Sequence, residues 1–502
     1  MAMKNGIFRE RVYGIENEFA PLFVLSKKKV FGANYKDGNQ VLLDCIRRGN
    51  GVFGVTSLAM GGNFEGGLWL RNGSRLYLDT GKHPEIASCE CRRVRDAVAY
   101  NKATEMLATR ILQFPKGDNR RIRIFKNNMG KGNDMMYANH ELFRYETFGC
   151  HENYLLWNTP HLVESALYPL VPFLSTRQIY DGAGWWINPE KGEFVLSQRA
   201  LFLSTSFSDS TTGPATAGRA IINLRNQPHG GEGSFKRFHL ILGDANMLEY
   251  ALFLKLATTG LALSLYENDE LPKYFLEFPV KALHELARGR DFNADIFSLR
   301  SEGGRIQKMS ALQLQSQYCE LATEHTRTAV FESEESEHEA RTGCNVWNEA
   351  ITALARKDKE WPIGRIDYAT KEYITEDMIR RGAKNLSPKV IRETVNLLYH
   401  ELGDGTLYSR LKENGVAKRI VSEADIEHAI QFPPSDTRAH VRGTLICRAL
   451  RKKMKKHLLN FVGWQEIGLG PPELREVLKK YPLTDPLESN PAWLNEVLLG
   501  CG

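Results

Sequence analysis

The pattern of apolar and polar residues changes about halfway along the chain. Over residues 1–245 the apolar residues occur mostly in short runs that favour β-strands. Over residues 246–431 they recur every three or four positions, which predicts helices at 247–266, 311–327, 346–356, 370–381 and 387–402. We therefore predict an α+β fold with one large domain at 1–431, strand-rich at 1–245 and mostly helical at 246–431. A small C-terminal domain at 432–502 follows the prolyl break QFPPSD.

The segment from Ser74 to Asp79 is a predicted strand with one apolar and one polar face. Its period of two places Arg75, Tyr77 and Asp79 on the polar face. Pro84 blocks continuation of the ladder, and the turn before it delivers Glu85 just past the end of the strand. A cation, a phenol and two carboxylates are thus gathered within a few residues. A half-buried edge strand with solvated charges would show the same pattern.

A second predicted strand, from Arg11 to Phe19, carries Glu16 and Glu18 on one face. Two carboxylates on one strand face repel each other unless a cation, a hydrogen-bond donor or bulk water relieves them. Magnesium suits such a pair, because it prefers hard oxygen ligands and is commonly shared with the phosphates of a nucleotide. The alternative is an acidic face that meets an arginine or a lysine.

The remaining pattern places these two strands in a larger sheet. Further strands are predicted at 121–125, 149–157, 193–199, 219–224 and 238–242, and further helices at 41–48, 93–112 and 165–177. The glycine-rich stretch 49–67 is predicted to be a loop or lid, and the acidic run at 332–339 a solvated loop. No GxxxxGK[ST] or GxGxxG motif follows a predicted strand, so ATP, if used, would lie on an antiparallel sheet lined with carboxylates.

Composition narrows the class of protein. The 502 residues carry a net charge of +6, and the basic residues are scattered, which does not favour a dedicated nucleic-acid-binding protein. The eight cysteines form no CxxC pair, and Cys89 and Cys91 are expected to be reduced, buried thiols of a cytoplasmic protein. The most apolar segment, 247–266, contains Glu249 and Lys255, and the N-terminus lacks an apolar signal core. We expect neither a membrane span nor export.

Several longer stretches carry a family resemblance. They are GIENEF, LRNGSRLYLDTGKHPEIASCEC, IFKNN, GCHENYLL, PFLSTRQI, LSQRA, RAIIN, FHLILGDANM and PPSDTRAHVRG, followed by Trp464. Together they resemble the Pup ligase and Pup deamidase/depupylase family, relatives of glutamine synthetase and the carboxylate-amine ligases. The resemblance implies a glutamine-synthetase-like antiparallel sheet that carries the ATP and magnesium site, packed with helices.

The resemblance also implies roles for individual residues. Asp79 matches the catalytic aspartate, which accepts a proton in a ligase. The matches to magnesium ligands are Glu16, Tyr77 and Glu85, and the matches to ATP contacts are Arg75, Ser88 and Trp464. Ser88 stands where the family has a threonine. By position and charge alone, Glu18, His151 and Arg225 are assigned as additional metal or phosphate groups.

The implied activity is ATP-dependent formation of an isopeptide bond. ATP would phosphorylate the side-chain carboxylate of the C-terminal glutamate of Pup or a Pup-like modifier, and a lysine of a protein substrate would attack the acyl phosphate. Lysine is protonated at neutral pH, so a carboxylate must take its proton first, and Asp79 is the predicted base.

Three alternatives remain open from the sequence. LRNG and GCHENY resemble the ligase branch, but a deamidase or depupylase that acts on the same modifier with a bound nucleotide shares nearly every motif. A non-catalytic protein that binds the modifier would be favoured by loss of Glu16, Asp79 or Glu85, and all three are present. The match through Trp464 argues against a small-molecule ligase of the glutamate-cysteine type. RNQPH at 225–229, where the family usually has RDEPH, suggests a divergent branch that serves a Pup-like modifier other than Pup itself.

Overall fold

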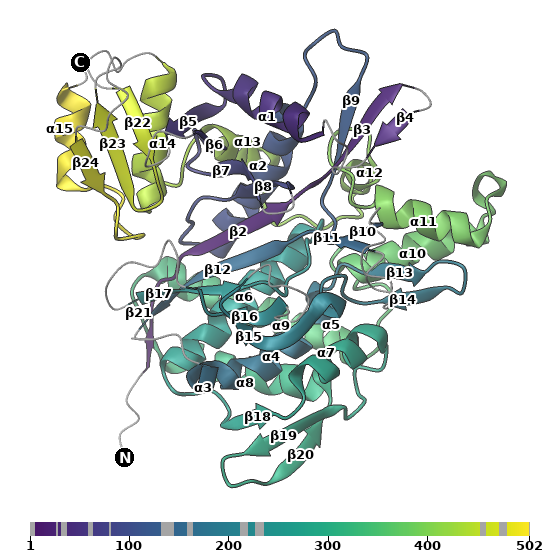
Figure 1. Ribbon diagram of the computed structural model, residues 1–502. Helices are drawn as coiled ribbons and strands as arrows, with labels where there is room; N and C mark the ends of the chain where they lie inside the picture. Colours follow the sequence, from purple (N-terminus) through teal and green to yellow (C-terminus); the bar gives the residue numbers. More distant parts are fainter. Residues whose placement is uncertain are drawn as a thin grey trace. The chain divides into compact units, whose positions relative to one another are not determined.

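The computed structural model (Figure 1) describes residues 6–26, 29–31, 38–58, 64–79, 82–131, 145–157, 164–210, 219–225, 235–451, 458–470 and 479–500. The chain divides into two compact units. The first unit contains residues 1–11, 127–225 and 238–420, and the second contains residues 12–126, 226–237 and 421–502. The boundary that we predicted between residues 431 and 432 stays a prediction.

The second unit is built on an antiparallel run of strands. Their order is β5-β6-β7-β8-β2, with bounds Gly54–Leu58, Phe64–Leu70, Arg75–Leu78, Pro84–Ala87 and Tyr13–Glu18. Strand β7 pairs with a neighbour on each side, so it is not the edge strand of the alternative interpretation. Glu85 lies inside β8, opposite Tyr77, and Pro84 begins that strand; the expectation that Glu85 follows the end of a ladder was wrong.

The predicted loop at 49–67 contains β5 and the start of β6, so that prediction was wrong for its described residues. Residues 59–63 lie outside the described part of the chain. The high glycine content favoured a loop prediction, but one of these glycines is needed where two strands approach closely. A Cβ added at Gly54 would lie 1.9 Å from the carbonyl oxygen of Trp69 in the neighbouring strand. A glycine is required there by close backbone approach, not by flexibility.

Other elements of the second unit cover and extend this run of strands. A second sheet has the order β4-β3-β9, with bounds Lys29–Phe31, Ala20–Ser26 and Arg121–Phe125. The helices of this unit include α1 (Gly38–Gly49), α2 (Val94–Ile111), α13 (Glu423–Gln431) and α14 (Arg438–Leu450). The helices predicted at 41–48 and 93–112 and the strand predicted at 121–125 are therefore confirmed.

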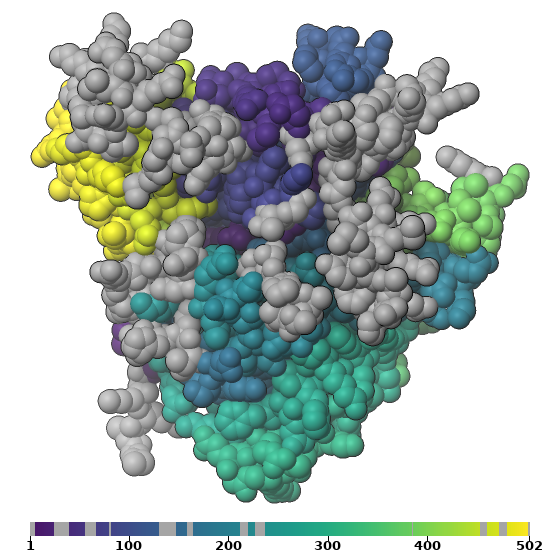
Figure 2. All heavy atoms as spheres, viewed as in Figure 1, coloured from purple at the N-terminus to yellow at the C-terminus, as the bar shows by residue number. Residues whose placement is uncertain are grey.

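The C-terminal segment forms a small sheet with the order β22-β23-β24, followed by a helix; the bounds are Leu458–Val462, Glu466–Gly470 and Lys479–Pro482, and Ala492–Gly500 for α15. Its apolar side chains share a core with α14 and with Trp69 of β6, which is 2% exposed. In the space-filling view this segment forms a block of atoms coloured yellow (Figure 2). Burial of Trp69 in this cluster ties β6 to a segment almost four hundred residues later in the sequence.

Another run of strands lies mostly in the first unit, in the order β15-β16-β17-β12, with bounds Leu203–Ser208, Arg219–Asn223, Phe235–Leu240 and Cys150–Trp157. Strands β16 and β17 pair antiparallel, with Asn223 opposite His239. Strands β15 and β16 pair parallel, so the expected antiparallel arrangement does not hold at this end. The α+β class itself is confirmed by the separate sheet and helical layers.

In the first unit, the helices predicted at 247–266, 311–327, 370–381 and 387–402 are confirmed, whereas the one predicted at 346–356 is the C-terminal half of a longer helix. The longest are α6, α8, α9, α10 and α11, at Glu249–Glu267, Ala311–Thr328, Glu334–Ala355, Asp367–Arg380 and Pro388–Leu398. The shorter ones are α3 (Glu164–Leu167), α4 (Val171–Thr176), α5 (Gln178–Asp181), α7 (Pro279–Arg288) and α12 (Leu407–Glu413). Within the described part of the chain, no helix combines the length and the hydropathy that a membrane span requires.

The remaining strands of the first unit form small sheets and pairs. They are β1 with β21 (Ile7–Phe8, Val330–Phe331), β10 with β11 (Met129–Lys131, Tyr145–Thr147), β13 with β14 (Trp185–Asn188, Glu193–Val195) and β18, β19 and β20 (Tyr274–Leu276, Phe297–Ser301, Ile306–Met309).

The acidic run at 332–339 is not the predicted loop, because most of it forms the first two turns of α9. Ser333 caps this helix: its hydroxyl accepts from the backbone N–H of Ser336, whose hydroxyl reaches back to the N–H of Ser333. The first turn contains Glu334, Glu335 and Glu337, and acidic residues at that end are stabilised by the helix dipole. Charge density alone therefore gave the wrong prediction.

Candidate functional site

Three carboxylates meet on one face of the sheet in the second unit. Glu18 lies at the end of β2, Asp79 directly after β7, and Glu85 in β8. The register sets Glu18 opposite Glu85, and Glu85 opposite Tyr77, so these side chains share a face. One oxygen from each of the three carboxylates lies within 4.8 Å of the others. The cluster thus joins residues from both of the strands singled out from the sequence.

Burial makes it unfavourable for the carboxyl groups of this cluster to be ionised together. Glu85 is 2% exposed, and this burial raises the pKa of its carboxyl well above the usual range. The carboxylates of Glu16, Glu18 and Asp79 raise that pKa further, whereas the hydroxyl of Tyr77, which donates to Glu85, opposes the shift. Burial, and then the charge of Glu85, also raises the pKa of Tyr77. A cation that takes carboxylate and phenol oxygens would relieve this repulsion, and the donor set fits magnesium.

His83 connects two members of the cluster. Its Nδ1 lies 2.6 Å from Oε2 of Glu18, in a pair that is almost fully buried. Its carbonyl oxygen accepts from the backbone N–H of Asp79 at 2.9 Å. His83 has no role among the sequence-based predictions, although its place two residues before Glu85 was an available signal. The imidazole fixes the orientation of Glu18 in the way that outer partners orient metal-binding carboxylates.

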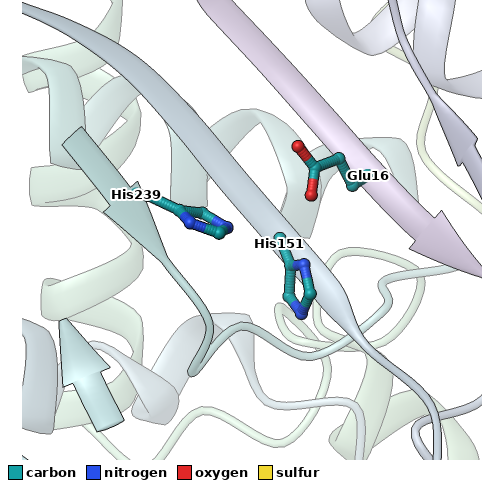
Figure 3. A group of neighbouring side chains, drawn as sticks. All are labelled: Glu16, His151 and His239. Carbon is teal, nitrogen blue, oxygen red and sulfur yellow. The ribbon is translucent and has the colours of Figure 1, made fainter. Parts of the chain in front are cut away.

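Glu16 is set apart from the three-carboxylate cluster by its own partner. It lies opposite Ala87 of β8, and its Oε1 is 3.6 Å from Nη1 of Arg237. Figure 3 shows Glu16 on its strand, and also His151 and His239. The two imidazoles belong to β12 and β17 of the first unit, with ring centroids 5.3 Å apart at an interplanar angle of 74°. Both histidines are buried, and His239 carries no sequence-based prediction.

Arg75 and Trp464, two of the predicted ATP contacts, are linked through a third residue. The guanidinium carbon of Arg75 lies 5.0 Å from the ring centroid of Tyr77 and 5.5 Å from that of Trp69. Trp464, in the turn between β22 and β23, meets Trp69 edge to face with ring centroids 4.7 Å apart. Trp69 therefore forms the platform between them, with geometry typical of cation–π and aromatic pairs. Trp69 has no role among the sequence-based predictions.

The other two predicted ATP contacts are placed differently. Ser88 is buried; its Oγ accepts from the backbone N–H of Ile15 at 2.9 Å and donates to the carbonyl of Cys89 at 3.3 Å. Its hydroxyl therefore joins β2 to the segment after β8. Arg225 belongs to the first unit, where it follows β16 with an exposed side chain, and its backbone N–H donates to Oδ1 of Asn223 at 2.8 Å. The rest of the RNQPH segment lies outside the described residues.

Comparisons with known proteins identify the family. A family model described as "Pup-ligase protein" matches residues 11–467. A Pup--protein ligase of Acidimicrobium ferrooxidans is 31% identical over 476 residues, which cover 94% of this chain and 95% of the relative.

Two solved structures share the fold. The crystal structure of the complex between the prokaryotic ubiquitin-like protein Pup and its ligase PafA superposes with a TM-score of 0.79 at 27% identity, covering 98% of this chain and 92% of the other. The structure of the Pup ligase PafA in complex with ADP superposes with a TM-score of 0.72 at 26% identity, covering 95% and 97%. These matches extend over nearly the whole chain and include every segment that carries the acidic cluster. The chain therefore belongs to the Pup-ligase family.

Proposed function

We propose that this protein is an ATP-dependent ligase that joins Pup, or a Pup-like modifier, to lysines of protein substrates. ATP phosphorylates the side-chain carboxylate of the modifier's C-terminal glutamate, and the lysine amine displaces phosphate to form the isopeptide bond. The observation that carries the proposal is the convergence of Glu18, Asp79 and Glu85 beside Tyr77 and Arg75 on one sheet face. Membership of the family and the PafA structures with Pup and with ADP support it.

The acidic cluster serves as the metal site in this proposal. Magnesium would be held by Glu18, Tyr77 and Glu85 of the cluster, and Glu16 is proposed as a further ligand because its charge also raises the pKa of Glu85. When bound, magnesium would neutralise phosphate charge during transfer. His83 keeps Glu18 oriented toward the cluster through its 2.6 Å contact. Burial of Glu85 excludes water from this wall, which strengthens every electrostatic interaction inside the site. Arg75 adds a fixed positive charge beside the cluster, where it favours phosphate oxygens.

Asp79 is the base that prepares the lysine. The amine attacks only after it loses a proton, and a carboxylate within hydrogen-bond reach can accept it. Two backbone bonds fix Asp79 at the turn: its N–H donates to the carbonyl of His83, and its own carbonyl accepts from Lys82, at 2.9 and 2.8 Å. The side chain remains partly exposed, unlike that of Glu85, so an incoming amine can reach it. This difference in exposure supports proton removal from the lysine by Asp79 and metal binding by Glu85.

We place the protein in the cytoplasm. Among the described residues the seven cysteines are free thiols, and all except Cys447 are buried. Free buried thiols are typical of proteins that stay in a reducing compartment.

The test combines the purified chain with magnesium, ATP, a lysine-bearing acceptor protein and Pup that ends in glutamate. We expect one ADP per conjugate and a mass shift on an acceptor lysine, both lost in Asp79→Asn. Asp118→Asn is the matched control, because Asp118 is an aspartate of the same unit whose carboxylate pairs with Arg120.

A parallel reaction uses Pup that ends in glutamine, or a preformed conjugate. Conversion of the glutamine to glutamate, or cleavage of the conjugate, without ADP production would support the deamidase or depupylase alternative and contradict the ligase. Binding of Pup with neither reaction would leave only the non-catalytic alternative.

A further inference from the structure

A buried carboxylate in the second unit is shared by two arginines of α14. Glu90, which follows β8, is 8% exposed, and Arg438 and Arg442 are 2% and 0% exposed. Nε of Arg438 donates to Oε1 of Glu90 at 2.7 Å, and Nη2 of Arg442 donates to Oε2. Burial alone would raise the pKa of Glu90, but Arg442 and then Arg438 hold it at about 2. The carboxylate is therefore ionised at neutral pH, and each of its oxygens is bonded to an arginine.

The two arginines direct their remaining groups to different places. Nη1 of Arg438 donates to the carbonyl of Leu483 at 3.0 Å. Arg442 lies against aromatic rings: its guanidinium carbon is 4.8 Å from the ring centroid of Trp464 and 5.4 Å from that of Trp69. Its Nη1 also points at the carbonyl oxygen of Trp464, at 3.4 Å. Arg442 thus contacts both the indole ring and the backbone carbonyl of Trp464.

This arrangement acts on an aromatic residue that packs at the margin of the C-terminal core. Trp464 lies in a hairpin turn, closed by the backbone N–H of Gly463 and the carbonyl of Glu466 at 2.9 Å, and its side chain is only partly buried. Trp69 supports one edge of the ring and Arg442 supports its face. A guanidinium is suited to this task, because its flat surface stacks on a ring while its edge stays bonded to a carboxylate.

We propose that Arg442, held by Glu90, is a positioning residue that sets the affinity for the nucleotide by fixing Trp464 before the nucleotide arrives. The inference rests on the proposed function and on the ATP contact that the family resemblance implies for Trp464. A ring that is already ordered loses less conformational freedom on binding, so the affinity is higher. Arg442 itself need not touch the nucleotide.

The main test measures ADP and ATP binding by titration calorimetry and steady-state kinetics with Arg442→Met. We expect the dissociation constants and the KM for ATP to rise about tenfold, the size expected for loss of one or two buried cation–π contacts. The kcat at saturating ATP and the KM for the modifier should change less than twofold, because the acidic cluster is untouched.

Arg438→Met is the matched control. It removes a buried arginine that is also bonded to Glu90, on the same helix, but one whose other bond goes to Leu483 instead of the turn around Trp464. We expect it to lower the melting temperature and to change nucleotide affinity less than twofold. Equal losses of affinity in the two variants would mean that Glu90 and its partners only stabilise the fold, and would overturn the inference.

A double substitution separates positioning from general damage. In a Trp464→Ala background, Arg442→Met should cause no further loss of nucleotide affinity, because Arg442 acts through the ring that is gone. A further tenfold loss would overturn the inference. If Arg442→Met does not fold, the same pair of measurements is made with Arg442→Lys, which keeps the charge toward Glu90 but loses the flat stacking surface. Absence of nucleotide binding in the unaltered chain would instead refute the proposed nucleotide site, and the inference with it.

Discussion

Glu18 and Glu85 lie directly opposite each other on the antiparallel strands β2 and β8. Like charges in this arrangement destabilise a sheet, and here Asp79 adds a third carboxylate within 4.8 Å. The sheet therefore concentrates carboxyl groups, and burial together with their mutual repulsion raises the pKa of Glu85 well above its usual range. That is the expected signature of a site whose stability is completed by a bound cation.

The first prediction concerns the metal. Magnesium at about a hundred times its dissociation constant should stabilise the unaltered chain by about 2.7 kcal/mol. Glu85→Gln should abolish this effect and the ligase activity, while the metal-free variant is at least as stable as the unaltered chain because a repulsive carboxylate is gone. Chemical unfolding with and without magnesium measures both. Glu488→Gln, an exposed position in the same unit, should behave like the unaltered chain; a magnesium effect that survives in Glu85→Gln would contradict the metal site.

The second prediction concerns the orientation of Glu18. His83→Ala removes the imidazole whose Nδ1 lies 2.6 Å from Oε2 of this carboxylate. Loss of such an outer partner commonly costs about 10- to 100-fold in metal affinity or activity. We expect the magnesium concentration for half-maximal activity to rise by a factor in that range, with the KM for the modifier unchanged. The measurement is ligase activity as a function of magnesium concentration. If the concentration for half-maximal activity is unchanged in His83→Ala, His83 does not orient Glu18 for metal binding.

The third prediction separates two roles of Ser88. Ser88→Ala leaves the buried N–H of Ile15 without its side-chain acceptor, which should cost about 1–3 kcal/mol of unfolding free energy. If Ser88 also contacts ATP, the KM for ATP should rise as well. Ser88→Thr keeps the hydroxyl and should restore both properties. A normal KM in a destabilised Ser88→Ala would restrict Ser88 to its structural bond.

The fourth prediction is a pH dependence in the first unit. Burial lowers the pKa of Lys371 to about 7, although its ammonium contacts the carbonyl of Gly184 and lies 2.8 Å from Nε2 of His400. In the unfolded chain a lysine titrates near 10.4, so between about pH 7 and 10 the unfolded state binds more protons. The unfolding free energy of the unaltered chain minus that of Lys371→Met should therefore increase with pH, by up to about 1.4 kcal/mol per pH unit. Urea unfolding of both proteins at pH 7 to 10 tests this; a flat difference would contradict it.

Local periodicity correctly predicted which side chains share a strand face. The alternation placed Glu16 with Glu18, and Tyr77 with Arg75, and the observed registers agree. Strand order and register are set by pairing between distant segments, so the position of Glu85 opposite Glu18 could not be derived from either strand alone.

The wrong and missing sequence-based predictions also involve contacts between residues that are distant in the sequence. Gly54 reads locally as a loop residue, but it is required by the carbonyl of Trp69, fifteen residues away. Arg442 and Glu90 both lie in stretches that carry the family resemblance, but their pairing could not be predicted, because they are 352 positions apart. Side chains whose role depends on such distant partners give no local periodic signal, and the roles implied by the family resemblance did not include them.

The distance between Glu90 and its arginines also bears on how the molecule is made. When Glu90 leaves the ribosome, 348 further residues must be added before Arg438 exists, and four more before Arg442. An ionised carboxylate cannot be buried without them, so in the growing polypeptide this part of the sheet must stay hydrated. The platform for Trp464 can close only near the end of translation. Any nucleotide contact that requires Trp464 to be held by Arg442 is therefore completed only after nearly the whole chain has been made.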